Sequence, residues 1–286
     1  MFYGWLLAIL TGIFFGLQGT YGKILAHRFP TAFLTWASFV FPLPFLFILL
    51  FQEGIPPVQW KEFIWATGVS FLVNVVAWYV FFRALAASPI HLTLPFTAFT
   101  PLFMIPMAYV LLGELPHRRG VLGILLIIGG AYGIHSGAGG WLQPLLNLFR
   151  ERGTRYMLFV ALIWSVSATV EKVAVLSSSP SFYAVVIFAL LGLAYLPYVL
   201  VGYRENLLAL RSYLGPLALW GVITGLMIIC QFSALQYLPA SYVIAFKRAG
   251  VIVGVILGYL LWKENNPVKN TLFTAIIIAG ALLIML

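Results

Sequence analysis

Two adjacent basic residues, Lys247 and Arg248, stand some seven residues into the apolar segment PASYVIAFKRAGVIVGVILGYLLW. In the middle of a membrane helix each costs roughly 2.5 to 3.5 kcal/mol, unless water or an anion receives it. A guanidinium donates two parallel hydrogen bonds to a carboxylate or phosphate, and an ammonium adds a compact positive charge. The pair therefore predicts a binding site for an anion.

Three further charged residues lie inside apolar segments. Lys23 and Lys172 occur at equivalent places in the two halves of the chain, and Glu171 directly precedes Lys172. Glu171 could neutralise one cation in a purely structural pair. Because one carboxylate cannot balance four cations, we favour a functional cationic cavity that includes all five residues.

The second half of the chain repeats the first. At a shift of 150 residues Glu114 aligns with Glu264, and the segments around them align without a gap. Near the start of each half the register changes by one, so that Lys23 matches Lys172. At the same 150-residue shift, Thr97 takes the place of Lys247 in the first half, and we expect Thr97 to belong to the site.

Composition places the chain in a membrane. Hydrophobic residues make up 63% of it and charged residues 8%, with a mean hydropathy of +1.04. A water-soluble domain of this length is far less apolar. The net charge of +9 is scattered without any nucleic-acid-binding module, so we expect membrane lipids and no nucleic acid as partners.

Ten apolar segments have about the length needed to cross a bilayer. We predict an all-α integral membrane protein in which five spans of each half surround a central cavity. Because five is odd, the halves must enter the membrane from opposite sides and form inverted repeats. The predicted divisions are residues 1–138 for the first repeat, 139–155 for a linker and 156–286 for the second repeat. The expected spans are 4–25, 31–51, 62–83, 91–113, 120–138, 156–175, 181–202, 214–235, 241–262 and 271–286.

Other polar and small residues carry weaker signals. Pro95, Pro101 and Pro106 predict a bend in the fourth span, whereas Gly250, with Gly254 and Gly258 one and two turns later, predicts close helix packing in the ninth. Some polar residues either line the cavity or bond neighbouring helices, and Glu114 and Glu264 are interpreted as anchors at the membrane interface. These polar residues are Gln18, Thr20, Asn74, His91, Thr97 and Gln231.

No catalytic or metal site is predicted. The single cysteine, Cys230, permits neither an intramolecular disulfide nor a thiolate cluster. No HExxH or GxSxG motif occurs, so we expect neither an enzyme nor a cofactor.

The distribution of basic residues bears on orientation. Loops on the side of the two termini carry Lys61, Arg118 and Arg119, whereas nine Lys and Arg residues fall on the opposite side. The positive-inside rule then places both termini outside. The family resemblance below implies cytoplasmic termini, and a reporter fused to Leu286 would decide between the two.

The chain resembles the drug/metabolite transporter superfamily, in its ten-helix branch of two EamA-type repeats. The resemblance rests on FFGLQGTYGK and IWSVSATVEK, on the helix ends VLLGE and YLLWKE, and on the Gly-Ala pairs of LLIIGGAYGI and AIIIAGALLI. It implies secondary transport by alternating access. AFKRAGVIVG is also similar to the Lys-Arg signature of sugar-phosphate and phosphate translocators, which implies that Lys247 and Arg248 are anion ligands. Those translocators have a further lysine near the position of Thr97, so carboxylates and other anions remain open alongside phosphate.

We therefore expect a secondary transporter for a small anionic metabolite, which would be an exchanger if it returns a second anion. The alternative is an exporter of amino acids or other neutral or zwitterionic metabolites, proton-coupled or facilitative, in which Glu171 binds a substrate ammonium. A scaffold protein would have no reason to retain cations inside its helices. We expect a monomer in the cytoplasmic membrane of a prokaryote.

Overall fold

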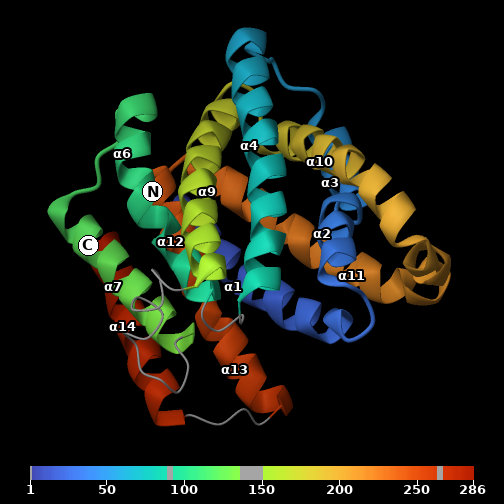
Figure 1. The fold of residues 1–286 in the computed structure, drawn as a ribbon. Coiled ribbons are helices and arrows are strands. Elements are labelled where there is room, and N and C mark those ends of the chain that lie inside the picture. The colour runs from blue at the N-terminus through green and yellow to red at the C-terminus, as the bar shows by residue number, and fades with distance from the viewer. Residues whose placement is uncertain (1, 89–92, 136–150, 263–266) are drawn as a thin grey trace.

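The structure is a computed structural model that describes residues 2–88, 93–135, 151–262 and 267–286. These residues form helices joined by short connections, and none of them lies in a strand (Figure 1). The helices of the first half are α1 (Phe2–Ala26), α2 (Thr31–Val40), α3 (Leu43–Glu53), α4 (Trp60–Ala87), the 3₁₀ helix η1 (Leu94–Phe99), α6 (Thr100–Leu112) and α7 (Arg118–His135). Those of the second half are α9 (Arg152–Leu176), α10 (Pro180–Gly202), α11 (Arg204–Leu235), α12 (Ala240–Ala249), α13 (Val251–Trp262) and α14 (Pro267–Met285).

The predicted spans correspond to these helices. Within the described residues, seven helical segments are long and apolar enough to cross a membrane, and two more are shorter apolar helices. Large apolar side chains such as Phe51, Val110 and Val201 are exposed on the outside, as lipid contact requires. The prediction of an all-α membrane protein of about ten helices in two inverted repeats is confirmed.

Three of the predicted spans are interrupted. The second span is divided into α2 and α3 at Pro42, and the fourth changes from η1 to α6 at Thr100. The ninth is divided into α12 and α13 at Gly250, which is the equivalent of Thr100 at the 150-residue shift. Pro101, in the first turn of α6, lacks a backbone N–H and favours a helix start there. The predicted bend of the fourth span thus lies beside Thr100, while Pro106 lies inside α6.

Gly250 also permits a close helix crossing. A Cβ atom at Gly250 would lie 2.0 Å from the carbonyl oxygen of Gly12 in α1, and a Cβ at Gly12 would lie 2.5 Å from the Phe246 carbonyl oxygen. The end of α12 therefore packs directly against the backbone of α1, so that only glycine fits at this contact.

The two repeats pack mainly against each other. α4 of the first half lies beside α9 of the second, and α1 of the first half lies beside α11 of the second (Figure 1). α7 and α14, the last helices of the two halves, also lie side by side. The third span contacts the sixth, and the first contacts the eighth. Because the first span is equivalent to the sixth and the third to the eighth, these two contacts are equivalent, as expected for two related repeats. The predicted boundary at residue 138 lies outside the described residues, and α9 begins at Arg152, within the predicted linker.

Candidate functional site

A cavity of about 200 Å³, here called the inner cavity, lies between helices of both repeats. Its walls combine apolar side chains with a small set of charged and amide groups, as ligand pockets generally do. Its charged and amide side chains are Gln18, Asn74, Glu171, Gln231, Lys247 and Arg248. The structure therefore brings three of the predicted site residues, Glu171, Lys247 and Arg248, to one cavity.

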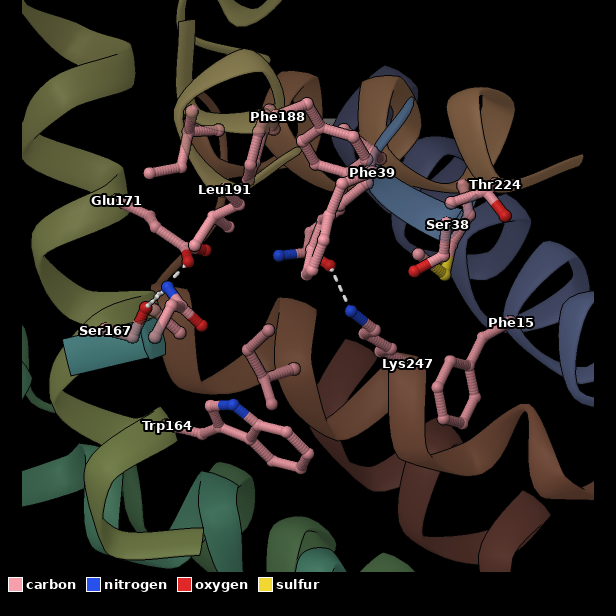
Figure 2. A pocket seen from close by; sticks show the side chains of 18 of the residues that line it. Phe15, Ser38, Phe39, Trp164, Ser167, Glu171, Phe188, Leu191, Thr224 and Lys247 are labelled. Atoms are coloured by element: carbon pink, nitrogen blue, oxygen red, sulfur yellow. Dashed lines mark hydrogen bonds between the residues drawn. The ribbon is translucent and has the colours of Figure 1, made fainter. Parts of the chain in front are cut away.

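Lys247 and Arg248 occupy the last turn of α12. The C-terminal end of a helix carries partial negative charge, so the break at Gly250 provides a favourable position for two cations. Lys247 Nζ donates a hydrogen bond of 2.7 Å to Oε1 of Gln231 on α11 (Figure 2). The ammonium also lies 5.6 Å from the ring centre of Phe15, within the range of a cation–π contact.

The guanidinium of Arg248 lies between two aromatic rings. Its Cζ atom is 5.7 Å from the ring centre of Phe15 on α1 and 5.6 Å from that of Trp164 on α9. Nη2 donates to Thr100 Oγ1 at 3.3 Å, and Nε is buried without a hydrogen-bond partner. A buried donor without a partner is costly, and a bound anion would satisfy it.

Glu171 faces the inner cavity from α9, on the side opposite Lys247 (Figure 2). Its Oε1 accepts a hydrogen bond of 2.8 Å from Ser167 Oγ, which in turn accepts one of 2.6 Å from Asn74 Nδ2. Tyr183 extends this network by donating to Ser70 Oγ at 2.9 Å. Lys247 bonds to Gln231 and not to Glu171, so the structural pair considered from the sequence is not a direct contact.

A second cavity, the outer cavity, has a volume of about 680 Å³. Two other predicted site residues, Lys23 and Thr97, line it, together with Thr20. Four residues line both cavities, namely Phe15, Trp78, Trp164 and Arg248. Arg248 thus connects the predicted residues of the inner cavity to those of the outer one.

Lys172 lies apart from the predicted cationic cavity. It lines neither cavity, and its Nζ donates to the Glu114 carboxylate and, at 2.7 Å, to the Leu238 carbonyl oxygen. Adjacent residues on a helix point about 100° apart, so Glu171 can face the cavity while Lys172 faces α6 and α12. Glu114, interpreted from the sequence as an interfacial anchor, instead bridges Lys172 and the start of α12.

Several lining residues were weak candidates or were missed. Gln18, Asn74 and Gln231 line the inner cavity, whereas His91 and Glu264 lie outside the described residues. The aromatic residues Phe15, Trp78 and Trp164 were not predicted. For Trp164 alone the sequence held a signal, because Trp164 and Ser167 precede Glu171 by seven and four residues and share its helix face.

An inverted pair of helical repeats around a charged cavity is the architecture of many membrane transporters. The chain belongs to the EamA-like transporter family, whose profile matches it twice, at residues 2–136 and 152–286. A solved structure titled "Crystal structure of protein" has a TM-score of 0.79 to it at 15% identity, covering 98% of this chain and 95% of that chain. This likeness concerns the fold alone. The search of curated proteins found no match.

Proposed function

We propose that the protein is a secondary transporter for a small anionic metabolite, with Lys247 and Arg248 as the anion ligands. The observation that carries the proposal is the position of both cations on one helix end at the wall of a central cavity. With Glu171 ionised, the charged lining of the inner cavity is two cations and one carboxylate. The net positive charge favours a bound anion over a cation.

The size of the inner cavity points to a compact substrate. Pockets for drug-sized ligands measure roughly 300 to 1,000 Å³, and the inner cavity measures about 200 Å³. A short carboxylate or a small phosphorylated compound suits this volume. The amide and hydroxyl groups of Gln18, Asn74 and Thr224 would bond the substrate's other polar atoms.

The architecture supports alternating access as the mechanism. Two inverted repeats can expose a central site to either side by rocking against each other, and broken helices commonly form such sites. Here the breaks at Thr100 and Gly250 lie in equivalent spans of the two repeats and next to Arg248. An exchange of two anions uses the same movement, with each half-cycle carrying one of them.

Glu171 favours a second candidate, a transporter of zwitterions such as amino acids. Its carboxylate faces the inner cavity opposite Lys247, so the two walls carry opposite charge. A substrate with a carboxylate and an ammonium would match both walls. In this case the substrate ammonium would bind Glu171.

Further expectations concern the surroundings of the protein. Family membership favours transport over catalysis, and the apolar helices make the protein a multi-pass membrane protein. We expect a monomer in the prokaryotic cytoplasmic membrane, in contact with lipid and without a cofactor. Crosslinking in native membranes would test the monomeric state.

The test is uptake into proteoliposomes. Labelled inorganic phosphate, short mono- and dicarboxylates, a three-carbon phosphate ester and amino acids would be compared for wild type, Lys247→Gln and Arg248→Gln. Lys61→Gln, at an exposed position of α4, is the matched control. A lost charge-assisted hydrogen bond costs about 1.5 to 3 kcal/mol, so each cavity variant should lower anion uptake by at least about tenfold.

The outcomes separate the candidates. Uptake of one anion that both cavity variants lose and Lys61→Gln keeps would support the anion proposal, and preloaded unlabelled anion should accelerate it in an exchanger. Equal anion uptake by all variants would overturn the proposed site. Uptake of amino acids but of no anion would favour the zwitterion candidate instead.

A further inference from the structure

A defined set of side chains lies at the boundary between the two cavities. Phe15 on α1, Trp78 on α4, Trp164 on α9 and Arg248 on α12 line both the inner and the outer cavity. We call these four residues the neck, because a solute that moves directly from one cavity to the other crosses the boundary that they form.

The neck is built around a pair of equivalent residues. Phe15 and Trp164 occupy the same place in the two repeats, in the register that also matches Lys23 with Lys172. Their ring centres lie 5.7 and 5.6 Å from Cζ of Arg248. Two equivalent residues of inverted repeats can contact the same side chain only if they lie near the axis that relates the repeats, and the binding site of such transporters lies at the repeat interface. The neck is thus central to the fold.

The two tryptophan rings of the neck pack against each other. Trp78 and Trp164 meet edge to face with centroids 5.4 Å apart, and Trp164 lies 5.7 Å from Phe81. Such pairs add about 0.5 to 1.5 kcal/mol beyond their buried area. The two tryptophans of the neck are therefore held by ring contacts with each other and with Phe81.

The neck also separates spaces of different size. The outer cavity is about 680 Å³ and the inner cavity about 200 Å³. A bulky anion can occupy the first without fitting the second. Arg248 is the neck's charged member, and its unpaired Nε and remaining N–H groups can bind an anion at the boundary.

We propose that the neck is a selectivity filter, in which Arg248 admits anions from the outer cavity while Phe15, Trp78 and Trp164 exclude bulky ones from the inner cavity. This inference rests on the proposed function, since it assigns the step by which an anion reaches Lys247. If the rings were only packing residues, their truncation would change stability without changing which solutes pass.

The experiment measures passage through the neck without requiring a known substrate. In a Cys230→Ser background, Thr97→Cys reports on the outer cavity and Thr224→Cys on the inner one. The probes are thiol reagents: ethylsulfonate methanethiosulfonate as a small anion, its trimethylammonium analogue as a small cation, and a stilbene-disulfonate maleimide as a bulky anion. The small reagents form a mixed disulfide and release methanesulfinate, and the maleimide adds the thiol across its double bond.

The filter predicts a distinct pattern of labelling. The outer thiol should react with all three reagents, and the inner thiol with the small anion several-fold faster than with the small cation and hardly with the bulky anion. Trp164→Ala should raise bulky labelling of the inner thiol by at least about tenfold and leave the outer thiol unchanged. Arg248→Gln should abolish the preference for the anionic small reagent at the inner thiol.

Matched variants keep the test decisive. Trp65→Ala replaces an exposed tryptophan of α4 and should leave all labelling rates unchanged, and Phe15→Leu tests the neck should Trp164→Ala fail to fold. Rapid bulky labelling of the inner thiol in wild type, or no effect of either neck variant, would overturn the inference. If the protein transports an anion but the neck variants do not change the labelling, the filter alone is refuted. If the neck variants change the labelling as expected but no anion is transported, the proposed function alone is refuted.

Discussion

Lys172 Nζ donates to the carboxylate of Glu114, and this ion pair joins the first helix of the second repeat to the end of α6 in the first. The other Glu114 oxygen accepts a hydrogen bond of 2.9 Å from the backbone N–H of Ala240, where α12 begins. Lys172 also donates to the Leu238 carbonyl oxygen. The pair therefore fixes the start of the helix whose last turn carries Lys247 and Arg248.

Removing one partner of this ion pair should destabilise the protein strongly. The side chains of Lys172 and Glu114 are only 8% and 20% exposed, and an unpaired buried charge costs about 3 to 5 kcal/mol. We expect Lys172→Met and Glu114→Gln each to lower the free energy of unfolding by up to this amount. The double variant should lose less than the sum of the two, as measured by a double-mutant cycle in detergent micelles. Strictly additive losses would show that the two groups do not interact.

Substitution of Gly250 should separate α12 from α1. A Cβ there meets the backbone of Gly12 at 2.0 Å, so the helices must move apart in Gly250→Ala. We expect a lower melting temperature and weaker anion uptake, because the neighbouring Arg248 would shift. Gly68→Ala is the control, since its Cβ meets nothing within 4 Å and alanine favours a helix by up to about 1 kcal/mol. A melting temperature for Gly250→Ala at or above wild type would contradict the close crossing.

The fold was largely predictable because the sequence patterns that indicate it extend over many residues. Apolar runs of about 20 residues and a repeat that keeps register over tens of residues leave few alternatives. The breaks were harder to predict, since proline and glycine bend helices in some places and are accommodated in others. Gly250, interpreted from the sequence as a packing residue, is both the packing contact and the break.

The charged lining of the inner cavity was predicted in part. An intramembrane charge is costly, so Lys247, Arg248 and Glu171 were evident from their type alone. The cost of burying a charge is the same argument for a residue that binds substrate and for one that forms an ion pair. For this reason Lys172 was grouped with the cavity, although it donates to Glu114. Trp78 and Trp164 were missed because aromatic residues are common throughout the chain. Apart from the helical spacing of Trp164 from Glu171, only their positions in space distinguish the aromatic residues of the neck from those that face lipid.

Tyr183 should tune the site through hydrogen bonds without touching the substrate. Its hydroxyl is buried and donates to Ser70, which lies 3.4 Å from Ser167, the residue that bonds Glu171. Tyr183→Phe should cost about 0.5 to 1.5 kcal/mol of stability and change the KM for uptake modestly. Tyr109→Phe, at an exposed position, should change neither. An unchanged melting temperature for Tyr183→Phe would show that the hydrogen bond contributes nothing net.

Glu171→Gln should change the KM for uptake in opposite directions for the two candidate functions. The glutamine keeps an oxygen to accept the Ser167 hydrogen bond but removes the negative charge that faces Lys247 across the inner cavity. For an anionic substrate this change removes a repulsion, so we expect the KM for anion uptake to fall by about three- to tenfold. For a zwitterion the variant removes the partner of the ammonium, and the KM should rise by at least as much. Glu62→Gln at the start of α4, away from both cavities, controls for loss of a carboxylate elsewhere. A higher KM for the anion in Glu171→Gln would mean that the carboxylate assists anion binding, and the positive charge of the cavity would no longer account for the substrate.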